Sequence, residues 1–340
     1  MSPALVITLR ILAALGLMLA NGVVLIYMLR KVLGHLHLRL GPIHMGPKGV
    51  LQTTMDVLKL LTKEDVTPSG VDKVLFFLAP AVVFTPSLLA YAAIPFSHTW
   101  SITDLDTGLL FTFAALSIVP IGILMAGWAS ANKWSLLGGM RAAAQQIAYE
   151  VPLLLSVLPI VMIVGSLNLG EIVIAQQGTW LGFVPRWFVL AQLPAFLLFL
   201  IASLVELNQT PFDLSEAESE LVAGFASEYS AMKFGVLFLS EFSNQFIMSA
   251  IGVAVFFGGW TLPGIPAGWY DAVPVLGPAI FMTKTYLGIF GLMWIRGTFP
   301  RVRIDQLMQI GWKWLIPASL VWIVLTGVVV KLWQLQQGVS

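Results

Sequence analysis

The sequence contains no cysteine and little charge, and each shortage excludes a class of protein. Without cysteine the chain cannot form a disulfide, a thiolate-held iron–sulfur cluster, a thiolate zinc site or a cysteine nucleophile. Charged residues make up 10% of the 340 residues, whereas 58% are hydrophobic and the mean hydropathy is +0.89. The net charge of +1 excludes the basic surplus of a nucleic-acid-binding protein and the acidic surplus of a disordered chain. This composition is typical of a membrane protein.

Histidine is also scarce, and its placement argues against a haem. The four histidines, His35, His37, His44 and His98, all lie outside the long apolar runs, so paired axial ligands within the membrane are missing. The sequence has neither a GxxxxGK[ST] loop nor a GxGxxG loop after a predicted strand. We therefore expect this chain to bind no metal, no redox cofactor and no NADH itself.

Long apolar runs predict an all-α polytopic membrane protein with eight transmembrane helices and long cytoplasmic loops. A bilayer core about 30 Å thick requires about 20 residues of apolar helix. Runs of this length occupy residues 8–30, 74–95, 107–130, 148–168, 187–206, 234–259, 275–296 and 313–333. The first run lacks the cleavage site of a signal peptide and is expected to be retained. Because no internal repeat or linker is visible, residues 1–340 are expected to form a single transmembrane domain.

The distribution of lysine and arginine predicts the orientation. Fourteen of the 18 basic residues lie in the connections after the first, third, fifth and seventh spans, and only Arg186 lies in an opposite loop. The positive-inside rule places those four connections in the cytoplasm. With eight spans, both termini are expected on the non-cytoplasmic side.

The first cytoplasmic connection contains a predicted amphipathic helix at residues 50–61. Val50, Leu58 and Leu61 follow helical spacing on one face, whereas Asp56 and Lys59 lie on the other. This pattern indicates a helix at the membrane surface. A helix packed on the cytoplasmic ends of the spans and a helix bordering an entry for a lipid-like substrate fit the pattern equally well.

The second cytoplasmic connection leads to a carboxylate inside a span. Gly138 and Gly139 are expected to break the helix there, and Arg141 and Tyr149 share a face of the segment that follows. Glu150 then enters the bilayer region, with only apolar residues after it for several turns. A functional role is the default for an intramembrane carboxylate, with structural anchoring as the alternative.

The third cytoplasmic connection is acidic, although the positive-inside rule predicts an excess of lysine and arginine in cytoplasmic connections. Six carboxylates face the single Lys233 there: Glu206, Asp213, Glu216, Glu218, Glu220 and Glu228. Ser215 and Glu218 form a capping box that predicts a short helix from Glu216. That helix leaves Glu206 and Glu228 unexplained. The alternative to a functional role is a solvated acidic face.

Two further charged residues are predicted inside spans, Glu241 in 234–259 and Lys284 in 275–296. Each is costly in lipid unless it faces a partner or water. Together with Glu150 and Glu206 they are the groups that a proton relay needs, because neighbouring charge changes the proton affinity of a carboxylate. The alternative is a set of buried pairs that hold helices together.

Motifs spread from residue 38 to residue 317 carry a family resemblance. They include LRLGP, MGPKGVLQ, RAAAQQIAYEVPL, PFDLSEAESELVAG and RVRIDQLMQIGWKWLIP. In these motifs the chain resembles the family of the H-type membrane subunit, also called subunit 1, of respiratory complex I, proton-translocating NADH:quinone oxidoreductase. The resemblance implies an eight-span protein of the cell inner (plasma) membrane, at the junction with the peripheral arm, that forms the quinone chamber and the first proton pathway.

The resemblance also implies substrate, partners and site residues. Quinone, such as ubiquinone, is the implied substrate, and FMN and iron–sulfur clusters are implied in partner subunits of the membrane and peripheral arms. The implied quinone-chamber residues are Arg39, Asp213, Glu216, Glu218 and Glu220. The implied acidic channel leading inward consists of Glu150, Glu206 and Glu241, and Lys284 joins this proton pathway by its position in a span.

The chain departs from many relatives at several positions, where an acid, a base or a proline is frequent: Leu29, Ile43, His44, Ser117, Gln209 and Ser215. These departures bear on the quinone and the proton route rather than on the fold. The nearest alternative is the homologous membrane subunit of an energy-converting hydrogenase or of a dehydrogenase fed by another electron donor. A solute transporter would require repeats and correspondingly broken helices, which we do not find in the sequence.

Overall fold

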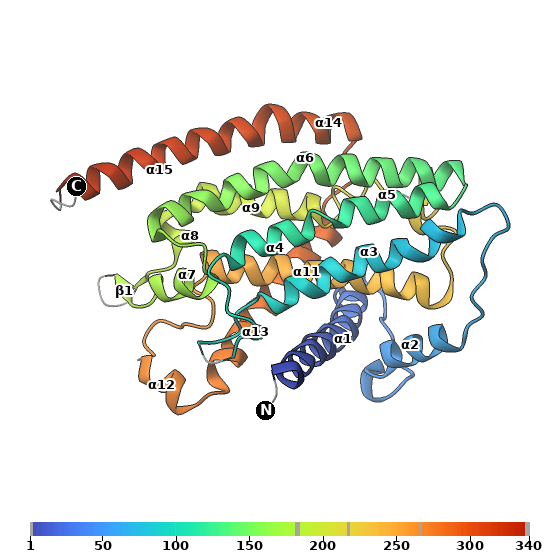
Figure 1. Ribbon diagram of the computed structural model, residues 1–340, viewed down its shortest axis with the longest axis horizontal. Helices are drawn as coiled ribbons and strands as arrows, with labels where there is room; N and C mark the ends of the chain where they lie inside the picture. Colours follow the sequence, from blue (N-terminus) through green and yellow to red (C-terminus); the bar gives the residue numbers. More distant parts are fainter. Residues whose placement is uncertain (1–2, 99, 181–183, 216–217, 266, 337–340) are drawn as a thin grey trace.

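Long apolar helices dominate the structure and run between two ends of the molecule (Figure 1). The computed structural model describes residues 3–98, 100–180, 184–215, 218–265 and 267–336. Seven segments of this described part are long and apolar enough to cross a membrane. They are α1 (Pro3–Leu36), α3 (Lys73–Ala92), α4 (Gly108–Leu116) with α5 (Val119–Ala129), α6 (Lys133–Val164), α11 (Ala231–Phe256), α13 (Leu276–Thr298), and α14 (Ile304–Gln309) continued through the π-helical η3 (Ile310–Leu315) into α15 (Ile316–Gln336). The predicted all-α polytopic membrane fold is confirmed.

The eighth predicted span, 187–206, forms a shorter helix. It consists of α8 (Phe188–Ala191) and α9 (Leu193–Glu206), separated at Gln192, where the backbone leaves the helical region (φ −123, ψ 40). Pro194 favours a new helix start at this point, because its missing N–H and fixed φ suit a first turn. The 14 residues of α9 reach about 21 Å, less than the roughly 30 Å core of a bilayer. The count of eight spans therefore remains a prediction, although α9 lies alongside α6 (Figure 1).

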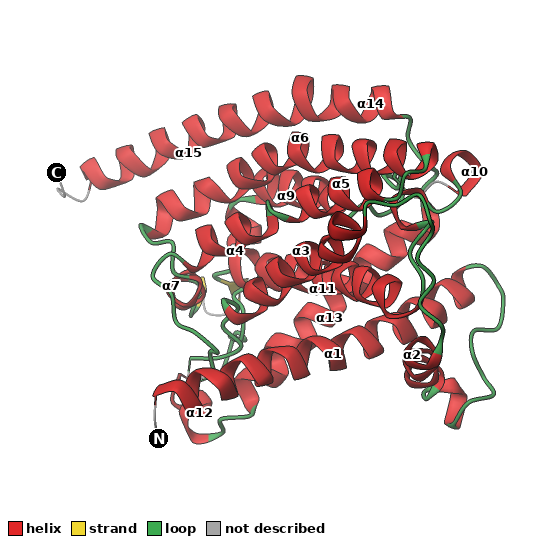
Figure 2. Ribbon diagram, turned by 45° about the vertical axis from the view of Figure 1, so that its right-hand side comes forward, coloured by secondary structure: helices red, strands yellow, loops and turns green. Residues whose placement is uncertain are grey.

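Shorter elements gather at the two ends of the bundle (Figure 2). They are η1 (Pro47–Gly49), α2 (Gln52–Thr62), α7 (Leu169–Ala175), β1 (Thr179–Trp180), β2 (Val184–Pro185), α10 (Glu218–Leu221), η2 (Gly224–Ala226) and α12 (Ala267–Ala272). Strands β1 and β2 pair antiparallel. We call the end that holds the start of α1, the end of α15, α7 and α12 the terminal end, and the end that holds α2, α10 and α14 the acidic end. The start of α1 and the end of α15 lie at the same end, which fits an even number of crossings between them.

The amphipathic helix is present as α2, within one or two residues of its predicted bounds. It packs against α1 and α11, and the Asp56 carboxylate accepts a hydrogen bond from Arg30 at the end of α1. Met55, Leu58 and Leu61 remain exposed. An apolar surface therefore stays open on this helix at the acidic end.

The glycine pair in the second connection does not break the helix, and that prediction is wrong. Helix α6 runs without interruption through Gly138 and Gly139. A Cβ atom built on Gly138 would lie 2.7 Å from the Cα of Gly224, and one on Gly139 would lie 3.2 Å from the Cα of Gly127. The two glycines instead let neighbouring backbones approach α6 closely, as small residues do between membrane helices.

Burial differs strongly between the long helices. Helix α11 is the most buried of the seven and lies against α1, α3 and α13. Helix α15 is the least buried and packs on α6 and α9 at the edge of the bundle. The segment before α15 is fixed to α6 by the Tyr149 hydroxyl, which donates to the carbonyl of Leu307 at 2.6 Å. Polar residues on α11 are therefore enclosed on several sides.

Candidate functional site

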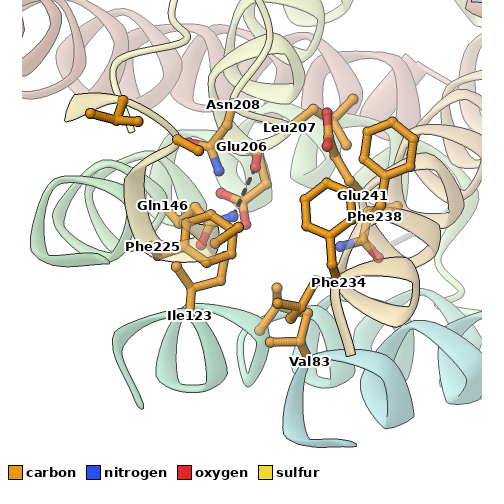
Figure 3. Close-up of a pocket in the computed structure, with 16 residues that line it drawn as sticks. Val83, Ile123, Gln146, Glu206, Leu207, Asn208, Phe225, Phe234, Phe238 and Glu241 are labelled. Atoms are coloured by element: carbon orange, nitrogen blue, oxygen red, sulfur yellow. Dashed lines mark hydrogen bonds between the residues drawn. The ribbon is translucent and has the colours of Figure 1, made fainter. Parts of the chain in front are cut away.

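A cavity of about 180 Å³ opens at the acidic end, where α3, α5, α6, α9 and α11 meet (Figure 3). Most of its wall is apolar or aromatic, including Phe225, Phe234 and Phe238. Five polar side chains interrupt this wall: Gln146, Glu206, Asn208, Glu241 and Asn244. The cavity therefore brings together Glu206 and Glu241, two predicted pathway carboxylates that lie 35 positions apart in the sequence.

Glu206 is the last residue of α9 and is buried, with 8% of the residue exposed. Its Oε2 atom makes no hydrogen bond to a described residue. Helix α9 ends here because Asn208 adopts a left-handed conformation (φ 49), which asparagine tolerates better than most residues. Glu150, one turn beyond Gln146 on α6, is close enough to repel the Glu206 carboxylate. Of the predicted pathway residues, Glu150 and Glu206 are therefore electrostatic neighbours.

The adjacent glutamines of α6 hold the end of α9 in place. Gln145 donates through Nε2 to the carbonyl oxygens of Val205 at 2.7 Å and Phe212 at 2.9 Å. Gln146 donates to the carbonyl of Glu206 at 3.1 Å (Figure 3). The last carbonyls of a helix have no partner within the helix. Gln146 provides one for Glu206, and Gln145 adds a second bond to the Val205 carbonyl, which also accepts from the N–H of Asn208.

Glu241 reaches the cavity from α11 and has a basic partner on α13. Its Oε1 atom lies 3.7 Å from Nη1 of Arg296, with about a quarter of each side chain exposed. The Asp213 carboxylate is a further charge close enough to repel Glu241. Glu241 therefore lies between an attractive and a repulsive charge at the cavity wall.

The acidic connection meets basic residues from other connections. Arg301 lies 3.3 Å from the buried Asp213 carboxylate, and Arg141 donates to Glu220 at 2.6 Å. Glu228 accepts a hydrogen bond from Asn132 at 2.7 Å. These long-range contacts give Asp213, Glu220 and Glu228 partners, whereas Oε2 of Glu206 has none among the described residues.

Two predicted chamber residues fall outside the described geometry. Glu216, and with it the predicted helix start, lies outside the described residues. Glu218 is the first residue of α10, and its side chain is likewise not described. The described part of the predicted helix is α10, which is only four residues long.

Arg39 and Lys284 lie apart from the cavity. Arg39 is exposed after the end of α1, where its N–H donates to the carbonyl of Gly34 at 2.8 Å. The Lys284 ammonium donates to the carbonyls of Phe257 and Thr261 at 2.7 and 2.6 Å and lies 4.7 Å from the centre of the Trp187 ring. Phe257 follows Glu241 by 16 residues, about 24 Å of helix. Lys284 therefore satisfies backbone carbonyls near the terminal end and does not join the carboxylates.

The remaining cavity residues have only weak signals in the sequence. Gln146, Asn208 and Asn244 are single polar residues in or beside apolar runs, and Arg296, the partner of Glu241, lies near the end of α13, 55 positions further along the chain. Among the described residues no three histidine or acidic side chains gather as a metal site. The arrangement is suited to holding and passing protons between carboxylates in an apolar cavity.

The chain is similar to proteins of one family. A family model described as NADH dehydrogenase matches residues 9–327. A Rhodospirillum rubrum protein is 44% identical over 326 residues, covering 96% of this chain and 94% of the relative. A Geobacillus kaustophilus protein is 48% identical over 305 residues (89% and 87%), and one from Dehalococcoides mccartyi is 45% identical over 313 residues (92% and 83%). Each relative is named as the H subunit of NADH-quinone oxidoreductase.

Proposed function

This chain belongs to the NADH dehydrogenase family, as a membrane subunit of an NADH:quinone oxidoreductase, and we propose that its acidic end forms the quinone chamber and the start of a proton pathway. The shared name of the relatives favours this enzyme over the homologous hydrogenase component. The proposal places the acidic end on the cytoplasmic side of the cell inner membrane, against a peripheral arm. Partner subunits there would hold the FMN and the iron–sulfur clusters that deliver electrons.

The observation that carries the proton pathway is that Oε2 of Glu206, which has no hydrogen-bond partner among the described residues, lies in the same cavity as Glu241. A buried carboxylate without full hydrogen bonding is costly in an apolar environment. Binding a proton or a water chain removes that cost. A pair of such groups in one cavity can therefore hold a proton on either carboxylate and pass it between them.

An electrostatic link to the quinone follows from the charges around Glu241. Reducing quinone to quinol takes up protons together with electrons. A change of charge at Asp213 or along the acidic connection would change the proton affinity of Glu241, because the Asp213 carboxylate repels the Glu241 carboxylate. Protons drawn from the chamber by the quinone would therefore shift the proton affinity of the next carboxylates inward.

The quinone itself would enter from the bilayer at the acidic end. The exposed apolar side chains of α2 lie beside α1 and α11, and such a surface suits a hydrophobic substrate. The quinone-chamber residues of this proposal are Arg39, Asp213, Glu216, Glu218 and Glu220. Of these, the structure describes the side chains of Arg39, Asp213 and Glu220. The surface helix is then a border of the entry and not only a cover for helix ends.

Isosteric neutralisation tests the pathway in the assembled complex. We expect Glu206→Gln and Glu241→Gln to assemble normally and to lower both quinone reduction by NADH and proton movement into proteoliposomes. The matched control is Glu171→Gln, an exposed carboxylate on α7 at the terminal end, which should leave both unchanged. Wild-type rates and wild-type proton yield in both cavity variants would refute the pathway.

A further inference from the structure

A second group of polar side chains lies deeper among the helices than the cavity. It consists of Asn21 from α1, Tyr91 from α3, Ser243 from α11 and Tyr286 from α13. The Tyr286 hydroxyl donates to Oδ1 of Asn21 at 2.6 Å. Asn21 is 3% exposed and Tyr91 is fully buried. Four helices thus contribute to one buried polar cluster.

The hydrogen bonds of this cluster are incomplete. Nδ2 of Asn21 and the hydroxyl of Tyr91 make no hydrogen bond of normal distance and angle to a described residue, and only looser contacts join the Tyr91 hydroxyl to the Asn21 and Ser243 side chains. Leaving a buried donor of this kind unpaired is costly. The usual solution in proteins is a bound water with several polar partners. Asn21, Tyr91, Ser243 and Tyr286 offer such partners.

The cluster is connected to the cavity by further polar groups. Asn244, which lines the cavity, accepts a hydrogen bond through Oδ1 from the Ser87 hydroxyl at 2.7 Å. Ser87 and Tyr91 are four residues apart on α3 and so lie on the same face, one turn apart. Ser243 precedes Asn244 on α11. Polar side chains therefore lead from the cavity to the cluster, which begins one turn of α3 beyond Ser87.

We propose that the Asn21, Tyr91 and Tyr286 cluster binds water and extends the cavity as a proton-conducting branch toward the terminal end. The proposal rests on the proposed proton pathway and adds a direction to it. In each transfer a water or tyrosine oxygen accepts a proton on a lone pair and releases its own proton to the next oxygen. No net charge remains on the branch, and Asn21 orients water without carrying a proton.

A purely structural cluster predicts different behaviour. Hydrogen bonds between membrane helices stabilise their packing. Removing a hydroxyl from such a cluster would lower the thermal midpoint without changing the number of protons moved. Proton yield and stability therefore separate the two roles.

The test uses Tyr91→Phe, Tyr286→Phe and Asn21→Leu in the complete complex, reconstituted into proteoliposomes. The matched control is Tyr270→Phe, which removes the hydroxyl of a buried tyrosine that accepts from the Leu262 N–H outside the cluster. We measure quinone reduction in the presence of an uncoupler, protons moved per NADH oxidised, and the thermal midpoint. The two tyrosine variants remove one oxygen each and decide the question if Asn21→Leu does not assemble.

We expect a loss of protons moved per NADH in the cluster variants, with uncoupled quinone reduction close to wild type and no loss in Tyr270→Phe. Wild-type proton yield in both tyrosine variants would overturn the branch, whatever happens to the thermal midpoint. Failure of the branch alone would leave the effects of Glu206→Gln and Glu241→Gln intact. Failure of the proposed pathway would instead remove those effects, so the two results are distinguishable.

Discussion

Gly138 sets how closely α6 approaches the acidic connection. Its missing side chain leaves room for the backbone of Gly224, whose Cα would lie 2.7 Å from an added Cβ. Backbone atoms cannot move aside as the end of a flexible side chain can. The position of η2, and with it one wall of the cavity, therefore depends on the absence of a single methyl group.

Gly138→Ala should therefore destabilise the protein by about 1–3 kcal/mol, the usual cost of overpacking a close contact. Thermal unfolding of the purified protein, followed by intrinsic fluorescence, measures the change. The matched control is Gly291→Ala on α13, where an added Cβ meets no atom within 4 Å. Because alanine favours helix over glycine, the control should be neutral or slightly stabilising. Equal effects in both variants would show that helix propensity, and not the contact with Gly224, determines the change in stability.

Single residues of the site were only partly predictable. Glu206 and Glu241 were predicted as functional because ionisable groups are costly inside a span. Their meeting in one cavity was not predictable, nor was the contact of Arg301 with Asp213, 88 positions away. Pairing at that distance depends on how the connections fold over one another, and hydropathy contains no information about it.

Lys233 illustrates how one side chain fixes a whole connection. At the start of α11 its ammonium lies 2.9 Å from Asp65 and 3.6 Å from the centre of the Phe77 ring, and only 12% of the side chain is exposed. The Ser230 hydroxyl accepts from the N–H of Val66 at 2.9 Å and donates to its carbonyl at 3.2 Å. The segment between α2 and α3 is thereby held against the start of α11.

Replacing Lys233 by methionine should release this segment. The methionine retains apolar packing but loses the ion pair and the attraction to the ring, so residues 64–67 should exchange backbone hydrogen faster. Hydrogen–deuterium exchange with mass spectrometry measures this. Lys59→Met on the exposed side of α2 serves as the control and should leave exchange in that segment unchanged. Unchanged protection in Lys233→Met would mean that Ser230 alone fixes the segment.

At the scale of elements, hydropathy predicted where helices cross and not where they end. Helix α6 begins at Lys133, 15 residues before the predicted span, because its first turns lie outside the apolar run yet remain helical. Helix α9 is shorter than predicted because the apolar run continues through the Gln192 break. Apolar content reports the environment of a segment, whereas caps, prolines and contacts determine its ends.

For the whole molecule, single cysteines test the topology, since the native chain contains none. Lys133→Cys and Glu220→Cys should label from the cytoplasmic side and Gln177→Cys from the opposite side, because the first two lie at the acidic end and the third near the terminal end. Among the described residues between Gln177 and Glu220, α8 and α9 are the helices that could cross. Labelling of Gln177→Cys and Glu220→Cys from the same side would show that α9 does not cross the membrane. The chain would then have seven spans instead of eight.

Helix α15 follows the other long helices in chain order and so leaves the ribosome after them. Its contacts are with α6 and α9, and Tyr149 on α6 already presents the hydroxyl that the Leu307 carbonyl accepts from. Gly311 allows the chain to pass the Tyr149 ring, whose nearest atom would lie 3.0 Å from an added Cβ. During biosynthesis in the bilayer, α15 can therefore dock sideways onto a surface that the earlier helices have already built.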